Sequence, residues 1–313
     1  MLALVSTPAF DPNGIAALDG AAARKSWETI SNDENKPLLN RALGGELYAP
    51  GSVFKIITAT AMLENGATPD TVIEAPTRWS PPGTTAEITN TSGACGDGSG
   101  KTDLRTAMKL SCNTPFAIAG MNFGAEKMIA AAEKFGFHQS LEIPLGVRPS
   151  VFPKTDDKAA LAMDSFGQRD VRVSPLQMAM VAAAVANKGI LMQPYLVDQV
   201  LTADLEVVQQ TAPKEFSRPM SEQTAAALHS MMLDVTRYDK INKAVPGIEV
   251  AGKTGTAEIA DGVTPHAWFI GFDSSENPKV AVAAFVENGG YGYRAAAPIV
   301  NSVINAVVNG GDS

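Results

Sequence analysis

Three runs rich in β-branched, aromatic and small apolar residues lie close together near the C-terminal end, over residues 249–259, 267–272 and 280–287. Two short polar segments that contain glycine, proline or serine separate them. Strands joined by short turns pair antiparallel, whereas parallel pairs need a long crossover connection. This order favours an antiparallel sheet over alternating βαβ units, and an apolar pattern over about 295–308 predicts a closing helix.

The rest of the chain has mostly helical patterns. The expected helices are at 53–63, 102–110, 114–122, 125–135, 156–164, 176–186 and 221–236. The expected strands are at 3–10 and 86–89, with a hairpin of 191–201 and 205–211, and a polar stretch runs to about residue 46. We therefore expect an α/β (α+β) fold with a mostly antiparallel sheet flanked by helices. A largely helical subdomain at about 70–185 is inserted between residues 1–69 and 186–313, which form a sheet-containing subdomain.

Composition excludes several classes of function. The 313 residues include 25 Lys and Arg against 33 Asp and Glu, a net charge of −8. An acidic chain without a basic stripe is a poor nucleic-acid binder. Apolar runs are too short for a membrane-spanning helix. The 3 histidines lie far apart and the 2 cysteines lack metal-ligand spacing, which argues against a metal centre.

Ser52-Val-Phe-Lys55 is the first of three motifs that carry chemistry. Residues three apart share one face of a helix, so the Lys55 amine reaches the Ser52 hydroxyl. A serine becomes a nucleophile when a base takes its proton, and a lysine becomes such a base when burial or a second cation lowers its pKa. Chance alone gives about 0.9 matches to this pattern in this chain, so the motif is not specific by itself.

Ser111-Cys-Asn113 is the second motif, at the break between two expected helices. A hydroxyl at this position can relay a proton to a leaving amine, and an amide can hold a substrate carbonyl or Lys55. Chance again gives about 0.9 matches. Ser275-Glu-Asn277 is a second match, which we interpret as a solvated turn.

Lys253-Thr-Gly-Thr256 is the third motif, within the first β-rich run. Lys253 supplies a positive charge that can lower the pKa of Lys55, and Gly255 lets a substrate backbone approach the strand. Thr254 and Thr256 offer hydroxyls to a carboxylate, and the Thr256 backbone N–H can stabilise an oxyanion. Chance gives only about 0.006 matches, so this motif is specific.

These motifs occur in the order of the penicillin-binding protein and serine β-lactamase signature. The chain resembles the transpeptidase domain of class B (monofunctional) penicillin-binding proteins, in the form seen in actinobacterial septal enzymes. Further segments that carry the resemblance are 4–13, 40–42, 48–55, 135–137, 167–178 and 266–272. The resemblance implies a penicillin-binding protein/serine β-lactamase-like fold in which residues 1–313 form one transpeptidase domain.

The resemblance also implies a reaction. Ser52 attacks the penultimate D-Ala carbonyl of a peptidoglycan stem peptide, releases the terminal D-Ala, and passes the acyl group to an amine of a neighbouring stem. β-Lactam antibiotics acylate the same serine. By the same likeness Lys55 is the base, Ser111 the proton relay and Asn113 a positioning group, while the third motif binds the carboxylate and the oxyanion. No metal or organic cofactor takes part.

Location and partners follow from the same likeness. We expect a membrane anchor and a non-catalytic module before Met1 in the full-length protein, which then lies at the extracytoplasmic face of the cell membrane. The expected partners are a membrane glycan polymerase and division proteins, in a pathway that serves cell division or cell shape. Nucleic acid is not among them.

Three related activities stay open. A D,D-carboxypeptidase uses the same chemistry with water as the acceptor. A serine β-lactamase needs a base for deacylation, and Glu142-Ile-Pro-Leu-Gly146 is a near match to such a segment that ends in Gly rather than Asn. A β-lactam sensor domain is acylated and then signals.

The two cysteines have two open interpretations. Cys112, in the middle of the second motif, is either a small buried hydrophobic residue or the partner of Cys95 in a disulfide. The second interpretation fits an extracytoplasmic domain, because oxidation is permitted there.

A few other residues receive simpler interpretations. Glu258 follows the third motif by two residues and is predicted to line the cleft and bind substrate. Tyr291 and Tyr293 are predicted to form a loop at the cleft edge. His266 is interpreted as packing at the sheet, and Asp239 as solvated.

Overall fold

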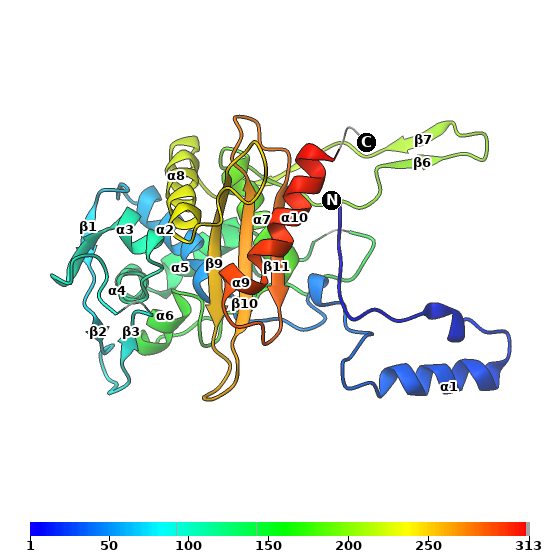
Figure 1. Cartoon of the computed structure of the whole chain (residues 1–313), viewed down its shortest axis with the longest axis horizontal. Coiled ribbons are helices and arrows are strands. Elements are labelled where there is room, and N and C mark those ends of the chain that lie inside the picture. Colours follow the sequence, from blue (N-terminus) through cyan, green and yellow to red (C-terminus); the bar gives the residue numbers. More distant parts are fainter. Residues whose placement is uncertain (92, 142, 311–313) are drawn as a thin grey trace.

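A three-stranded antiparallel sheet in the order β11-β10-β9 forms the centre of the molecule (Figure 1). The computed structural model describes residues 1–91, 93–141 and 143–310. The strands are β9 (Val250–Ala257), β10 (His266–Asp273) and β11 (Ala281–Val286). The central strand places Trp268 opposite Gly255 on one side and Phe285 on the other. The predicted antiparallel sheet is confirmed, and β9 is its edge strand on the side of the motifs.

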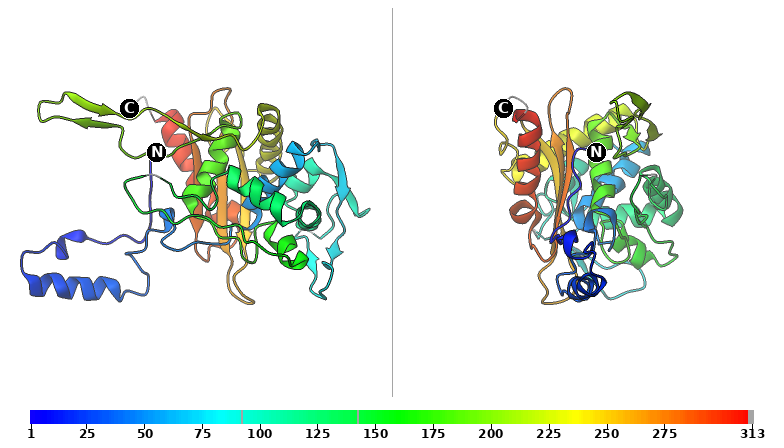
Figure 2. Two further views of the ribbon diagram at one scale, coloured as in Figure 1. Left: turned by 180° about the vertical axis from the view of Figure 1, so that it is seen from behind. Right: turned by 90° about the vertical axis from the view of Figure 1, so that its right-hand side faces the viewer.

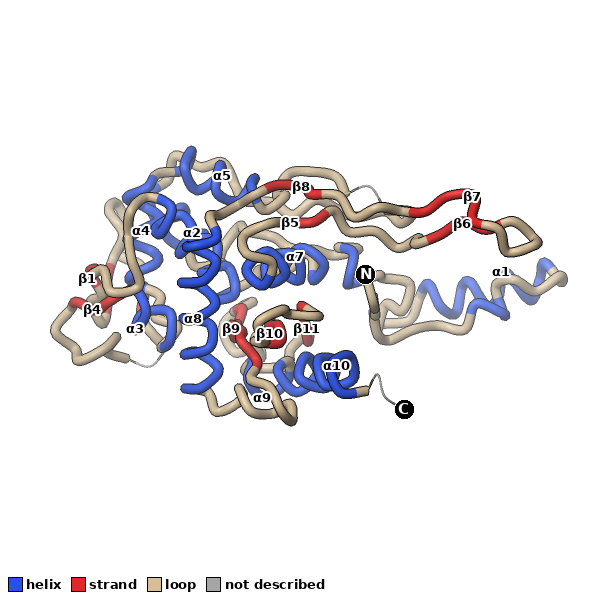
Figure 3. The backbone as a smooth tube through the Cα atoms, turned by 90° about the horizontal axis from the view of Figure 1, so that it is seen from above, coloured by secondary structure: helices blue, strands red, loops and turns tan. Residues whose placement is uncertain are grey.

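Helices cover both faces of this sheet (Figure 3). On one face lie α9 (Gly292–Ala295) and α10 (Ala297–Asn309), and Val300 and Ile304 pack with Phe269 in a small core. The opposite face carries α7 (Pro175–Ala186), and α8 (Glu222–Tyr238) runs along β9. The edge of β9 is thereby left facing the segment that leads into α2 (Lys55–Glu64).

The region between α2 and α7 is mostly helical. Its helices are α3 (Leu104–Lys109), α4 (Thr114–Phe123), α5 (Ala125–Lys134) and α6 (Lys158–Asp164). Two small antiparallel pairs accompany them, β1 (Val72–Glu74) with β4 (Lys101–Asp103) and β2 (Arg78–Trp79) with β3 (Ile88–Thr89). Side chains cap the helix starts, for example Asp103 on α3, Ser174 on α7 and Ser221 on α8. The predicted helices are confirmed, with ends shifted by a few residues.

α2 is the central helix of this region. Every residue from Lys55 to Leu63 is buried, because apolar side chains surround the helix on all sides. The helix contacts α4, α5 and α8. A lysine at its first turn is therefore held inside the protein rather than at its surface.

Two arms project from one end of the body (Figures 1 and 2). We call residues 1–40 the N-terminal arm; it contains η1 (Pro12–Gly14) and α1 (Gly20–Ser31), a helix that lies in the predicted polar stretch. The strand predicted at 3–10 is wrong. In this described segment Ser6 bonds through its side chain to Leu39 and Arg41, and the segment has no ladder of backbone bonds to a neighbour. Strand propensity without a pairing partner leaves an extended segment.

The second arm, which we call the hairpin arm, covers residues 196–211. It contains β6 (Gln199–Leu201) and β7 (Val207–Gln210), as predicted. The predicted strand 191–201 is two strands, however, since β5 (Leu191–Met192) pairs with β8 (Glu215–Ser217). Pro194 separates β5 from β6, because proline lacks the N–H that a continuous ladder needs.

Two further features complete the fold. A 3-10 turn, η2 (Arg41–Leu43), joins the N-terminal arm to the body. Of the helices in the described residues, none combines the length and the apolarity that crossing a bilayer requires.

Candidate active site

The turn before Ser52 brings the serine close to the edge of β9. Ser52 lies in η3 (Gly51–Phe54), which runs directly into α2. Gly51 has a φ of +54°, and its N–H donates to the carbonyl of Gly167 over 2.8 Å. A Cβ at Gly51 would lie 2.5 Å from the Thr256 carbonyl oxygen, so only glycine allows this approach.

Lys55 is fully buried, and three oxygens lie within 3.0 Å of its amine. Its Nζ lies 2.7 Å from the Ser111 carbonyl oxygen, 2.8 Å from Asn113 Oδ1 and 2.9 Å from Ser52 Oγ. The first two oxygens only accept hydrogen bonds, whereas a hydroxyl also donates. A neutral amine with two hydrogens and one lone pair therefore fits this site, with the lone pair toward the Ser52 hydroxyl.

The charge state of Lys55 favours that arrangement. Burial, and the positive charge of Lys253, hold the pKa of Lys55 well below its usual value. A lysine that is neutral near neutral pH can take a proton from a hydroxyl within hydrogen-bond distance. The geometry and the electrostatics of Ser52 and Lys55 are thus those that a nucleophile and its base require.

The second motif forms the wall opposite Ser52, between α3 and α4. Ser111 has a φ of +54°, a conformation that costs energy for a residue with a Cβ and that is enriched at functional sites. Asn113 is fixed at both ends: its Nδ2 donates to the Thr89 carbonyl over 2.8 Å, and its backbone N–H donates to Asn90 Oδ1 over 2.7 Å. This anchoring orients the Oδ1 atom of Asn113 toward Lys55.

A disulfide joins Cys95 to Cys112, 17 residues apart, and both cysteines are fully buried. Of the two interpretations of these cysteines, the disulfide is the one that the structure shows. It ties the glycine-rich segment around Cys95 to the middle residue of the second motif. The wall that carries Ser111 and Asn113 is therefore covalently linked to the loop that precedes α3.

Lys253 connects the second and third motifs. It is fully buried, and its Nζ donates to Ser111 Oγ over 2.8 Å and to the Thr254 carbonyl over 2.9 Å. Burial lowers the pKa of Lys253 to about 8, an effect that the nearby Asp239 carboxylate opposes. The charge of Lys253 disfavours protonation of Lys55 and so contributes to its lowered pKa. Ser111 Oγ lies between the two amines, 3.4 Å from Lys55 Nζ.

The rest of the third motif presents backbone groups to Ser52. The N–H and C=O of one strand residue point to the same side, and the Thr256 carbonyl faces Gly51. The N–H of Thr256 therefore also faces the serine turn from the free edge of β9. Gly255 packs tightly, because a Cβ there would lie 3.0 Å from Val53 and from Trp268.

The structure does not bring Glu258 into this group. It lies one residue beyond β9 and is exposed. Within the described residues it makes no hydrogen bond to the other motif residues. Its predicted place in the site stays a prediction.

The segment after α6 contacts and braces the turn that contains Gly51 and Ser52. The sequence did not predict this contact. Gly167 accepts from the Gly51 N–H, and Gln168 Nε2 lies 3.4 Å from the Thr256 carbonyl. Asp164 anchors this segment, because its buried Oδ1 accepts from the Asp170 N–H over 2.9 Å. Burial raises the pKa of Asp164 to about 7. The only sequence signal for this brace was the likeness of 167–178 to class B enzymes.

Asp239 was interpreted as solvated, and that interpretation is wrong. It is half-buried at the end of α8, and its Oδ2 accepts from the Thr254 hydroxyl over 3.3 Å. His266, by contrast, packs edge-on against Tyr48 and Phe285, as expected of a structural residue. The position of Asp239 at a helix end did not predict its contact with Thr254, because that contact depends on how α8 packs against β9.

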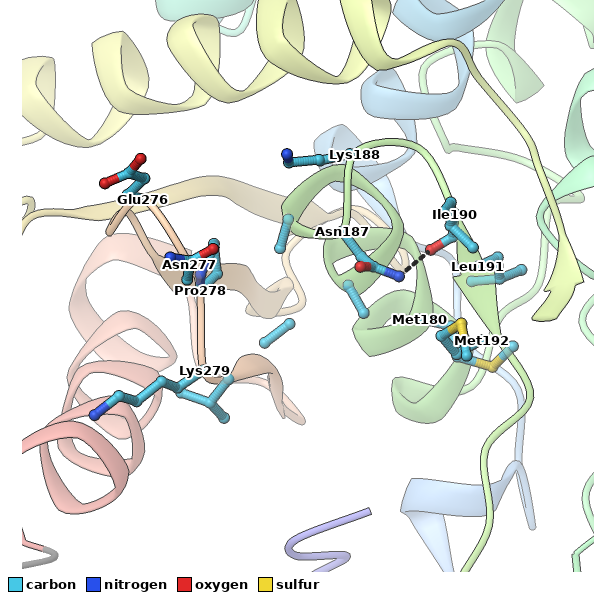
Figure 4. Close-up of a pocket in the computed structure, with 14 residues that line it drawn as sticks. Met180, Asn187, Lys188, Ile190, Leu191, Met192, Glu276, Asn277, Pro278 and Lys279 are labelled. Carbon is cyan, nitrogen blue, oxygen red and sulfur yellow. Dashed lines mark hydrogen bonds between the residues drawn. The ribbon is translucent and has the colours of Figure 1, made fainter. Parts of the chain in front are cut away.

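A separate pocket of about 430 Å³ lies between the end of α7 and the turn joining β10 to β11 (Figure 4). Apolar side chains such as Met180 and Met192 line one part of it, and Lys188, Glu276 and Lys279 line another. None of its lining residues belongs to the three motifs.

A serine beside a buried lysine, a second hydroxyl and an edge strand that faces the serine form the arrangement that acyl transfer through a serine requires. A family model of the penicillin-binding protein transpeptidase domain matches residues 1–305. The chain belongs to this family.

Known proteins agree with that assignment. The peptidoglycan D,D-transpeptidase PbpA of Mycolicibacterium smegmatis is 42% identical over 99% of this chain and 65% of its own length. The structure of penicillin-binding protein A from M. tuberculosis as a ceftriaxone acyl-enzyme has a TM-score of 0.93 at 40% identity, covering 98% of this chain and 71% of that one. A peptidoglycan synthase complex that coordinates polymerization and crosslinking has a TM-score of 0.80 at 25% identity, covering 98% and 53%. The chain thus spans 65% of the length of its curated relative.

Proposed function

We propose that this chain is the catalytic domain of a peptidoglycan D,D-transpeptidase that works through an acyl-enzyme on Ser52. The observation that carries the proposal is the buried Lys55 amine, 2.9 Å from Ser52 Oγ and fixed by two other acceptors. The relative and the structural neighbour described above, a D,D-transpeptidase and a β-lactam acyl-enzyme, support the same chemistry. We further propose that residues 70–185 act as a helical subdomain of this one domain.

In the first half-reaction Ser52 Oγ attacks the penultimate D-Ala carbonyl while its proton passes to Lys55 Nζ. The oxygen of the tetrahedral intermediate takes the negative charge, which the N–H groups of Ser52 and Thr256 stabilise. The carbon–nitrogen bond then breaks, and the leaving D-Ala nitrogen receives the proton from Lys55 through Ser111 Oγ. Lys253 holds Ser111 by a 2.8 Å hydrogen bond and keeps this relay in place.

In the second half-reaction an amine of another stem peptide attacks the acyl carbon. Its proton returns along the same path, and Ser52 is regenerated. The terminal carboxylate of the donor peptide is bound by Lys253 and by the hydroxyls of Thr254 and Thr256, next to Gly255. Asn113 acts by orienting Lys55, since its amide is anchored on the Thr89 carbonyl.

Location and partners are further parts of the proposal. A buried disulfide beside the site supports an oxidising, extracytoplasmic setting. The likeness to a synthase complex that couples polymerization to crosslinking supports a membrane glycan polymerase as partner. We propose that the full protein acts on the outer face of the cell membrane.

The test is a reaction with a donor peptide ending in D-Ala-D-Ala and a second peptide carrying a free amine. The proposal predicts D-Ala release together with a cross-linked product that is lost in Ser52→Ala. A hydrolysed donor without cross-link would indicate the D,D-carboxypeptidase instead. Steady turnover of nitrocefin would indicate the β-lactamase, for which the candidate base Glu142 lies outside the described residues. Acylation by penicillin without D-Ala release would indicate the sensor domain.

A further inference from the structure

Asp239 is an acidic residue at a position where the surrounding backbone does not stabilise a negative charge. It caps the C-terminal end of α8, with its N–H donating to the Val235 carbonyl over 3.0 Å. The C-terminal end of a helix carries a partial negative charge, so an anion there is unfavourable. Partial burial adds a further cost for the charged form. The stability of α8 does not explain this carboxylate.

The partners of Asp239 lie in the third motif. The Thr254 hydroxyl donates to Asp239 Oδ2 over 3.3 Å, and the neighbouring Lys253 ammonium favours the ionised carboxylate. Asp239 in turn favours the charged form of Lys253. The acid on α8 and the two residues on β9 therefore form one electrostatic group.

This group is also the one that the proposed function assigns to the substrate carboxylate. A threonine hydroxyl has a single hydrogen. When Thr254 donates it to Asp239, that hydrogen is not available to a bound carboxylate. The charge of Asp239 also repels a second carboxylate that approaches Lys253.

We propose that Asp239 is a specificity-determining residue that weakens the carboxylate subsite formed by Lys253 and Thr254. The terminal D-Ala, which carries this carboxylate, then leaves quickly after the acyl-enzyme forms and clears the way for the acceptor amine. This inference rests on the proposed function and identifies the residue that limits the affinity of the subsite for anions.

Two thioesters that differ in one charge test the inference. Benzoyl-D-alanyl thioglycolate carries a carboxylate on its leaving group, and its methyl ester is neutral, while both leave the same acyl group on Ser52. The measurement is the second-order rate constant of acylation of the whole chain by each compound. Glu222→Gln is the matched control, because it removes the same charge from the other end of α8.

Asp239→Asn is expected to raise the rate constant for the carboxylate compound about tenfold relative to the rate constant for the methyl ester. Glu222→Gln is expected to change neither. Asp239→Ala, which also frees the Thr254 hydroxyl, is expected to raise the ratio of the two rate constants at least as much. An unchanged ratio in Asp239→Asn, or a lower one, overturns the inference. Failure of the Ser52 acyl-enzyme chemistry, on which the inference rests, has a different signature, because then the wild type is acylated by neither compound.

Discussion

The three-motif site and the two arms distribute polar and apolar side chains in opposite ways. The site buries two lysines completely, Lys55 and Lys253, next to each other. The arms consist of exposed helix and strand residues, although such elements usually bury one face. α1 has no buried residue, and β6 and β7 are exposed throughout. Trp27 in the N-terminal arm is half exposed, whereas Trp268 in β10 is fully buried.

This difference shows which region of the fold contains interactions that are unfavourable for stability. Two neighbouring buried amines are unfavourable unless hydrogen bonds and a lowered pKa compensate, and the site supplies both. Such an arrangement is retained for chemistry. The arms contribute little to the core and accept substitution more easily. Substitutions in the site are therefore expected to change activity. Substitutions in the arms are expected to change almost nothing.

The largest expected effect is on catalysis at Lys55. Lys55→Met keeps a long side chain in the buried position but removes the base. The second-order rate constant of acylation by penicillin G is expected to fall on the order of 1000-fold, in the range of lost general-base catalysis. The free energy of unfolding is expected to change less than the rate, because the gain from burying an apolar chain is opposed by the loss of the donor to Asn113 Oδ1 and the Ser111 carbonyl.

The exposed Lys188 provides the matched control. Lys188→Met is expected to acylate at the wild-type rate. An acylation rate of Lys55→Met within a factor of ten of wild type would contradict the assignment of the base.

The second effect compares two tryptophans. Trp268→Ala is expected to lower the free energy of unfolding by about 3–5 kcal/mol, since a large side chain leaves the core. It also removes the 3.0 Å bond from the indole N–H to the Ala49 carbonyl, next to the serine turn. Trp27→Ala is expected to cost less than about 1 kcal/mol. Urea unfolding measures both, and equal losses would show that the N-terminal arm is part of the core.

The smallest effect is a pH dependence at Asp164. Its pKa is about 7 in the folded protein against an ordinary value of 3.8. The folded state therefore binds more protons between these values, and this contribution to stability is lost as the pH rises from about 4 through 7. Asp164→Asn does not titrate, so its free energy of unfolding relative to wild type is expected to rise by a few kcal/mol between pH 4 and pH 8.

The measurement is urea unfolding of both proteins across that pH range. Taking the difference between the two proteins cancels the titration of groups that they share. A difference that does not change with pH would show that the Asp164 carboxyl has no raised pKa.

Sequence reasoning succeeded where a local pattern fixes the outcome. Helices such as α5 and α7 follow from apolar periodicity and from caps such as Ser174. The sheet follows from β-rich runs joined by short turns. The three motifs were found because acyl transfer needs a nucleophile, a base and an oxyanion donor, and few residue types provide them.

It failed where the outcome depends on a distant partner. Residues 3–10 have strand propensity, but no neighbouring strand pairs with them in the described structure. α1 is a separate case, because it carries a local signal, the cap at Asp19, which the prediction overlooked. The positions of Asp239 and Gln168 depend on how α8 and the segment after α6 meet β9, which no local pattern encodes.

Covalent labelling by penicillin G tests the central claim most directly. The wild-type protein and Ser52→Ala are incubated with penicillin G, and each is measured by intact mass spectrometry followed by peptide mapping. The account predicts one penicilloyl adduct on the wild type, located on Ser52, and none on Ser52→Ala. The same adduct on Ser52→Ala, or an adduct mapped to another residue, would contradict it.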